Sequence, residues 1–168
     1  MTAEEVKKLL GLRPHPREGG WYVRTYEAAE MVAAEAFEDG RYASGRRTGT
    51  AIYYLLEPDT FSEMHRLKSD EVFHFYVGDA VEMLQLMPDG SGRRVVIGNH
   101  FVAGERPQVV VGRGVWQGSR LVAGGKWALF GCTVSPGFEF EDYEDGDRVS
   151  LSKGWPEFAA MIAALTRR

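Results

Sequence analysis

The sequence feature that most constrains the fold is the stretch 61–79, which contains two of the four histidines of the chain. Its second half alternates with a period of two, the pattern of a β-strand whose two faces have different surroundings. The alternation places Glu71, Phe73 and Phe75 on one face, and Val72, His74 and Tyr76 on the other. The Gly78-Asp79 pair is typical of a turn and ends the predicted strand.

The first half of this stretch predicts a second strand that pairs with the first. His65 and Leu67 are two residues apart and share a face, and the segment 68–70 is typical of a tight turn. Pairing of the two strands directs His65 and Glu71 into the same interior. Burying an imidazole beside a carboxylate is unfavourable unless the two are hydrogen-bonded or hold a ligand. The pattern therefore predicts a functional site here.

The rest of the chain repeats the strand-and-turn pattern and indicates an all-β fold. About nine or ten short strand-like segments are separated by turns that contain glycine or proline, as in an antiparallel sandwich or barrel. Helices are expected over residues 3–10, where Thr2 and Glu5 fit a capping box, and over residues 155–167. Residues 29–36 are also helix-prone by composition.

Composition limits the partners and the location of the protein. A length of 168 residues with 44% hydrophobic residues suits one domain. The net charge of −4 gives no general attraction to nucleic acid, and no apolar run is long enough to span a bilayer. The acidic N-terminus is unlike a signal peptide, and the single cysteine, Cys132, excludes an internal disulfide. We expect a cytoplasmic protein that binds neither nucleic acid nor membrane.

The spacing within 61–79 is similar to the first sequence motif of the cupin superfamily. His65, Glu71 and Gly78 match this motif, whereas Asp59 stands in place of its first glycine and Leu67 in place of its second histidine. The resemblance implies a jelly-roll barrel, an eight-stranded antiparallel architecture.

A second cupin motif resembles the run V-G-R-G-V-W-Q-G-S-R, with Gly112 in place of its proline and Gln117 in place of its histidine. Further runs, among them E-G-G-W-Y and G-C-T-V-S-P-G-F-E-F-E-D, look like one subfamily of uncharacterised cupins over residues 18–142. The resemblance implies a single cupin domain over 1–168, with the core barrel at about 18–142. Arg24 stands where this subfamily usually carries a glutamate.

The matched positions argue against a metal centre. Metal-binding cupins present three histidines and one glutamate, whereas the corresponding residues here are His65, Leu67, Glu71 and Gln117. Leucine cannot ligate a metal, and neutral glutamine is a poor ligand for zinc, iron or copper. We therefore expect no metal and no other cofactor. A metal-dependent oxygenase or isomerase that uses His65, Glu71 and Gln117 is kept as an alternative.

The leading hypothesis is a metal-free pocket that binds a small molecule, similar in fold to metal-free sugar-nucleotide epimerases. His65 is the expected catalytic acid or base, Glu71 its catalytic orienting partner, and Gln117 a polar contact to a sugar or nucleotide sugar. A non-catalytic binding or storage-type protein is a further alternative, because fold alone does not determine function.

Several other residues are candidates for contact with the substrate. Aromatic side chains form the expected apolar wall of the pocket: Tyr53, Phe73, Phe75 and Trp116. His74 is a further candidate contact, although strand alternation places it on the face opposite Glu71.

Polar segments outside these motifs are expected at the surface. This applies to His15, which lies between two prolines, to His100, and to the acidic tract 138–143. Three arginines in one loop, Arg41, Arg46 and Arg47, are expected to be solvated, with a phosphate or carboxylate at the barrel mouth as the alternative. The cupin resemblance also implies a homodimer that covers exposed strand edges.

Overall fold

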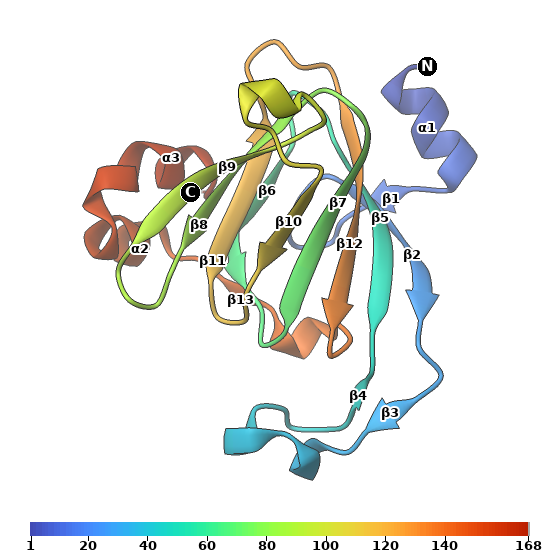
Figure 1. Ribbon diagram of the computed structural model, residues 1–168, viewed down its shortest axis with the longest axis vertical. Helices are drawn as coiled ribbons and strands as arrows, with labels where there is room; N and C mark the ends of the chain where they lie inside the picture. The colour runs from blue at the N-terminus through green and yellow to red at the C-terminus, as the bar shows by residue number, and fades with distance from the viewer. Residues whose placement is uncertain (168) are drawn as a thin grey trace.

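Two antiparallel sheets face each other in the computed structural model, which describes residues 1–167 (Figure 1). The six-stranded sheet has the order β1 (Arg13–Pro14), β2 (Trp21–Glu27), β5 (Thr50–Leu56), β12 (Ala128–Ser135), β7 (Asp70–Gly78) and β10 (Gln108–Val111). The five-stranded sheet has the order β13 (Glu144–Asp145), β6 (Phe61–Arg66), β11 (Trp116–Leu121), β8 (Val81–Leu86) and β9 (Gly92–Ile97). This architecture confirms the all-β prediction.

The main core lies between the two sheets, where alternate residues of each strand meet. Val81 and Met83 of β8 point inward and pack with residues such as Phe73 and Phe130 of the other sheet. The opposite face of β8 is also covered, because Leu84 packs against the C-terminal helices. Burial on both faces explains why apolar residues occupy both faces of β8, with Val81 and Met83 on one and Leu84 and Leu86 on the other, rather than following a clear alternation.

Short helices lie at both ends of the chain. The N-terminal helix α1 (Ala3–Leu10) has the predicted capping box and ends at Gly11 in the left-handed region. The predicted continuous helix over 155–167 is wrong in its bounds: the structure has α2 (Arg148–Gly154), the 3₁₀ turn η5 (Pro156–Phe158) and α3 (Ala159–Ala164). The carboxylate of Asp147 accepts a hydrogen bond from the Ser150 amide and so starts α2 early. No helix in residues 1–167 has the length and apolar character needed to cross a bilayer.

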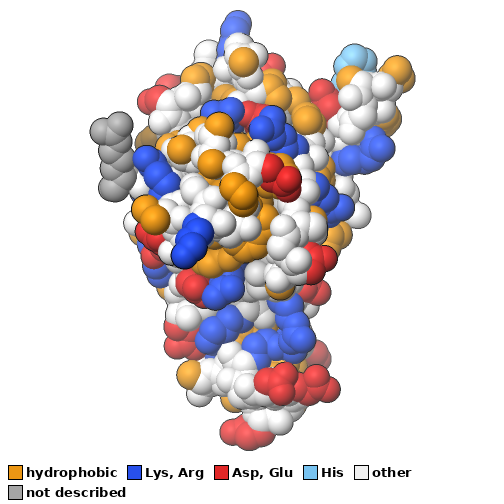
Figure 2. All heavy atoms as spheres, turned by 90° about the vertical axis from the view of Figure 1, so that its left-hand side faces the viewer, with side chains coloured by type: hydrophobic (Ala, Val, Ile, Leu, Met, Phe, Trp, Pro, Cys, Tyr) orange, Lys and Arg blue, Asp and Glu red, His pale blue; other side chains and the backbone are white. Residues whose placement is uncertain are grey.

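An arm projects from one end of the barrel (Figure 1), and the molecule narrows toward it in Figure 2. It consists of β3 (Met31–Val32) paired with β4 (Arg46–Arg47), with the 3₁₀ turns η1 (Ala34–Ala36) and η2 (Glu38–Gly40) between them. The helix expected over 29–36 is therefore wrong. Pairing with β4 overrides the local helix propensity of this segment.

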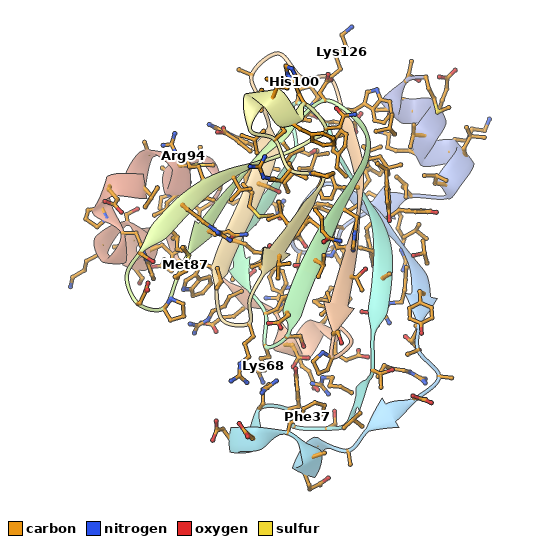
Figure 3. All side chains as sticks on the ribbon, viewed as in Figure 1. Phe37, Lys68, Met87, Arg94, His100 and Lys126 are labelled. Atoms are coloured by element: carbon orange, nitrogen blue, oxygen red, sulfur yellow. The ribbon has the colours of Figure 1, made fainter. Side chains whose placement is uncertain are left out.

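Two further 3₁₀ turns complete the chain, η3 (Phe101–Ala103) and η4 (Phe140–Asp142). His100 immediately precedes η3 and is exposed at the end of the barrel away from the arm (Figure 3), which confirms the expectation of a solvated side chain.

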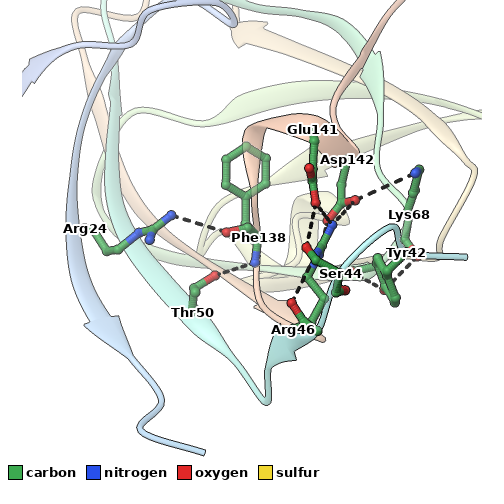
Figure 4. A network of polar contacts seen from close by, with 11 residues as sticks. Arg24, Tyr42, Ser44, Arg46, Thr50, Lys68, Phe138, Glu141 and Asp142 are labelled. Carbon is green, nitrogen blue, oxygen red and sulfur yellow. Dashed lines mark hydrogen bonds and ion pairs between the residues drawn. The ribbon is translucent and has the colours of Figure 1, made fainter. Parts of the chain in front are cut away.

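A buried ion pair attaches the arm to η4 (Figure 4). The guanidinium of Arg46 donates from Nε to Oδ2 of Asp142 over 2.7 Å and from Nη2 to Oδ1 over 2.9 Å. Both side chains are at most 2% exposed, and Glu141 also accepts a hydrogen bond from Arg46. The expectations of a solvated Arg46 and of a solvated acidic edge over 138–143 are therefore wrong at these positions. A charge is buried here because a bidentate partner compensates it.

We predict that Asp142→Asn destabilises the protein by about 3 kcal/mol, because it leaves the Arg46 guanidinium buried with one fewer compensating charge. Chemical denaturation at neutral pH measures the loss. Glu144→Gln is the matched control, since Glu144 forms a bidentate pair with Arg66 in which both side chains are at least 40% exposed. The control is expected to lose less than about 1 kcal/mol, and equal losses in the two variants would contradict the prediction.

Candidate functional site

A β-bulge in β6 determines which of its side chains reach the interior. Gln117 of β11 pairs with His65 and Ser119 pairs with Ser62, so that β6 has one more residue than its partner between these points. The extra residue allows Ser62 and His65 to lie toward the interior, whereas Met64 packs against the C-terminal helices. A Cβ at Gly118 would lie 2.7 Å from the sulfur of Met64 and 3.1 Å from the carbonyl oxygen of Ser62, so a larger residue there would force the buried Met64 side chain to shift.

A hydrogen bond between the two sheets connects Gln117 with Glu71. The amide Nε2 of Gln117 donates to Oε2 of Glu71 over 2.6 Å, and both side chains are buried. Burial raises the pKa of Glu71 to about 7, and the nearby charge of Glu18 adds to the rise. The neighbouring His65 and hydrogen bonds from Gln117 and Cys132 partly offset it. Glu71 can therefore gain or lose a proton near neutral pH.

His65 is oriented by a backbone carbonyl rather than by Glu71. Its Nδ1 lies 2.7 Å from the carbonyl oxygen of Glu63, and because a carbonyl can only accept, Nδ1 must carry the proton. In the neutral ring, Nε2 then has a free lone pair. The structure gives no hydrogen bond between His65 and Glu71 within residues 1–167, so the expected role of Glu71 as orienting partner is replaced by Glu63. The ring of Tyr143 stacks on His65 with centroids 4.7 Å apart.

His15 is a site residue that sequence reasoning missed. Its side chain is 4% exposed, which corrects the expectation of a solvated loop histidine. The backbone amides of Glu18 and Arg17 donate to Nδ1 of His15 over 2.8 and 3.4 Å, so the neutral ring carries its proton on Nε2. That nitrogen lies 3.9 Å from a carboxylate oxygen of Glu18. Burial lowers the pKa of His15, which favours the neutral ring, while Glu18 partly offsets this effect.

These groups line one interior cavity of about 330 Å³. Its charged and titratable lining includes Arg13, His15, Glu18, Arg24, His65 and Glu71. Its apolar and aromatic lining includes Tyr22, Ile52, Leu67, Phe138, Phe140 and Tyr143. The volume is at the lower end of the range for small-molecule sites.

Two buried polar atoms, one in the cavity lining and one directly behind Glu71, have no hydrogen-bond partner among the described residues. They are the hydroxyl of Tyr143, which lines the cavity, and Oε1 of Gln117, whose Nε2 is bonded to Glu71. Burial raises the pKa of Tyr143, so its hydroxyl stays protonated at neutral pH and can donate. Unsatisfied buried polar atoms are unfavourable, and a bound ligand that supplies partners for them removes this cost.

Six of the predicted contact residues do not line this cavity, and one of them, Gln117, lies behind Glu71. Phe73 and Phe75 lie in the core between the sheets, and Trp116 packs toward the C-terminal helices. Tyr53 lies on the outer face of the six-stranded sheet, edge-on to Tyr76. His74 also lies on that face and contacts Thr133 and Gln108.

The aromatic wall is instead formed by Tyr22, Phe138, Phe140 and Tyr143. These residues come from β2 and from the segment after β12, which fold against the cavity only in three dimensions. Arg24, at the position where the resembled subfamily usually has glutamate, lines the cavity and donates to the carbonyl of Phe138.

The donor set does not fit the metal centre of a metal-binding cupin. Leu67 lines the cavity at the position of a ligand histidine, and Gln117 uses its amide to bind Glu71. His15 has its proton on Nε2 and its Nδ1 lone pair is used by backbone amides, so it offers no lone pair. Within residues 1–167, no group of three or more histidine, cysteine, aspartate or glutamate side chains is arranged to share one metal ion.

Comparisons with known proteins agree with this architecture. The family described as "Cupin superfamily (DUF985)" matches residues 4–145. The chain is similar to a hypothetical protein of known structure from Leishmania major, with 32% identity, a TM-score of 0.89 and full coverage of both chains.

Two further relatives extend the comparison. A structural genomics target from Shewanella oneidensis is 32% identical with a TM-score of 0.85, over 99% of this chain and 98% of that one. An uncharacterised protein from Saccharomyces cerevisiae is 29% identical over 89% of this chain and 79% of its own length.

We predict that Glu71→Gln removes part of the pH dependence of stability. The pKa of Glu71 is raised in the folded protein, so its contribution to stability is fully present below about pH 4.5 and is lost as the pH rises through about 7. The free energy of unfolding of the wild type should therefore fall relative to that of the variant between pH 5 and pH 8, by up to about 3 kcal/mol.

Urea denaturation of both proteins at four pH values in this range measures the difference. The histidines are common to both proteins, so their own titrations largely cancel. Asp89→Asn, at a fully exposed carboxylate, is the control and should run parallel to the wild type. A constant difference between Glu71→Gln and the wild type across this range would contradict the assignment.

Proposed function

Since the chain belongs to the DUF985 family of the cupin superfamily, we propose that its interior cavity binds a small polar molecule and transfers protons on it, as an epimerase or isomerase does. The observation that carries the proposal is the pair of opposite tautomers at one cavity. His15 presents a proton on Nε2, and His65 presents a lone pair on Nε2. One ring is therefore set up as an acid and the other as a base.

Each ring is fixed in its tautomer by backbone groups of its own segment. His15 belongs to the segment between β1 and β2 of the six-stranded sheet, and His65 belongs to β6 of the five-stranded sheet. The two rings thus reach the cavity from different sheets. Because the backbone cannot change its donor and acceptor character, each tautomer is preorganised before any ligand enters.

The chemistry balances without a redox partner. The lone pair of His65 takes a proton from a carbon next to a carbonyl, and the C–H electron pair moves into an enolate whose oxygen accepts a hydrogen bond from His15 or Tyr143. Return of a proton to the carbon regenerates the carbonyl, with inverted configuration when the proton arrives at the other face. Glu71 has a pKa near 7 and is a second group able to supply or accept a proton.

The lining favours a hydroxylated ring as the ligand. Tyr22, Phe138 and Phe140 offer apolar faces, while the lining also presents the unsatisfied hydroxyl of Tyr143 and the polar groups of His15, His65 and Glu71. A sugar has apolar C–H faces and hydroxyl edges that match both kinds of surface. We therefore propose a sugar or the sugar part of a nucleotide sugar as the substrate class.

We predict that the wild type exchanges a carbon-bound proton of its substrate with solvent. A thermal-shift panel of free ketoses and nucleotide sugars first selects a ligand. Proton NMR of that ligand in D₂O then follows loss of the exchanging signal, which detects proton abstraction even without net turnover. His65→Gln should slow the exchange at least about 100-fold, since general base catalysis contributes this much, and His15→Gln should also slow it.

His74→Gln is the matched control, because it makes the same substitution on the outer face of the sheet and should exchange at the wild-type rate. Ligand binding with no exchange in the wild type would overturn the catalytic proposal in favour of a non-catalytic binding protein. Full exchange in His65→Gln would overturn the role given to His65.

A further inference from the structure

A second hollow of about 560 Å³ shares two wall residues, Leu67 and Tyr143, with the interior cavity. We call it the outer groove. Three separate turns bring cations to it: Arg41 from the arm, Lys68 from the β6–β7 turn, and Arg113 from the β10–β11 turn. Figure 2 shows Lys and Arg side chains gathered toward the arm end of the face it displays, and Figure 3 shows Lys68 pointing toward the arm.

The carboxylates that line the outer groove are already engaged by other arginines. Glu144 forms a bidentate pair with Arg66. Asp142 and Glu141 accept hydrogen bonds from the buried Arg46, which lies behind the groove wall and is not part of its lining. These acidic groups therefore do little to neutralise the remaining cations.

The remaining cations are poorly compensated. The side chains of Arg41 and Arg113 make no hydrogen bond or ion pair with any residue in 1–167, and Nε of Arg41 is buried without a partner. Lys68 lies 3.9 Å from Asp142, a carboxylate that already has a bidentate partner. A buried guanidinium N–H without an acceptor is unfavourable, and an anion in the groove would satisfy it.

Hydrogen bonds connect the three turns that carry these cations. The hydroxyl of Tyr42, next to Arg41, lies 2.7 Å from Oγ of Ser69 and donates to the carbonyl of Lys68 over 3.1 Å, which joins the arm to the β6–β7 turn. The Arg113 amide donates to Asp70 of that same region over 2.7 Å. The three turns are thus connected to one another before any ligand binds, which reduces the entropy cost of binding.

We propose that the outer groove binds a phosphate group. Two guanidinium groups and an ammonium group suit the charge and the several acceptor oxygens of a phosphate, which bidentate arginines recognise well. This inference rests on the groove alone and not on the proton-transfer chemistry of the cavity. A nucleotide sugar, with its ring in the cavity and its phosphate in the groove, would connect the two sites across the Leu67–Tyr143 wall.

The test is isothermal titration calorimetry of the full chain with inorganic pyrophosphate at low ionic strength. The double variant Arg41→Gln and Arg113→Gln should weaken binding at least about tenfold, and added salt should weaken wild-type binding because the sites are partly exposed. The charge-matched control is the double variant Arg94→Gln and Lys126→Gln, two exposed residues that Figure 3 shows away from the groove. The control should change the dissociation constant less than about twofold.

Thermal unfolding of both double variants shows whether they fold. Should the groove variant fail to fold, the single variant Arg113→Gln, at an exposed side chain, takes its place with an expected loss of at least about threefold. Absence of pyrophosphate binding by the wild type, or equal weakening in the groove and control variants, would overturn the proposal. His65→Gln should bind pyrophosphate like the wild type, so failure of the groove and failure of the catalytic proposal are distinguishable.

Titration with uridine diphosphate and with a uridine diphosphate sugar distinguishes a phosphate that belongs to a nucleotide sugar from a phosphate that binds in the groove alone. If the uridine diphosphate sugar binds more tightly than uridine diphosphate, and if this difference is lost in both the groove variant and His65→Gln, one ligand spans both sites. Equal binding of all three compounds supports a groove that recognises phosphate alone, and either result supports the proposal.

Discussion

The buried ion pair between Arg46 and Asp142 is the interaction on which the site depends. Asp142 is followed directly by Tyr143, which stacks on His65 and closes one side of the cavity. Phe140, two residues before Asp142, lies near His15. An uncompensated buried charge is strongly unfavourable, so the pair determines where this segment can lie. The arm therefore acts as an anchor for the cavity wall, although it contains none of the acid–base groups.

At the cavity, backbone groups determine which ring nitrogen of each histidine carries the proton. A carbonyl fixes the proton of His65 and two amides fix the lone pair of His15. Neither arrangement needs a charged partner, which matters in an interior where each added charge is costly. Glu71 follows the same rule, because burial favours its neutral form and moves its pKa into the range where it can exchange protons.

Local patterns predicted the parts of this site that lie on regular strands. The alternation of β7 predicted that Glu71 faces inward, and it does. The motif spacing predicted Gln117 near both other residues, and Gln117 pairs with His65 and donates to Glu71, whereas His65 is bonded to the Glu63 carbonyl and not to Glu71. The aromatic contacts Tyr53 and Trp116 were misplaced because both faces of these strands are covered, so aromatic character did not tell the inner face from the outer.

Strand alternation and motif spacing do not reach His15 and Tyr143, since both lie in irregular segments whose burial depends on contacts far along the chain. A signal for His15 existed in its flanking prolines and in Glu18 three residues later, a rigid polar turn next to a strand. For Tyr143 the sequence showed an acidic tract, which alone is typical of a solvated edge. Contacts with distant residues, among them the Arg46 pair and the stack on His65, reverse that interpretation.

Leu67 offers no metal-ligating donor and at the same time forms an apolar wall. It stands where metal-binding cupins have a histidine, and with Tyr143 it forms the wall shared by the cavity and the outer groove. An apolar side chain at this point removes a donor from the interior and lowers the local polarity around His65 and Glu71. Lower polarity strengthens hydrogen bonds and raises carboxyl pKa values. The apolar side chain that cannot ligate a metal is thus also consistent with the raised pKa of Glu71.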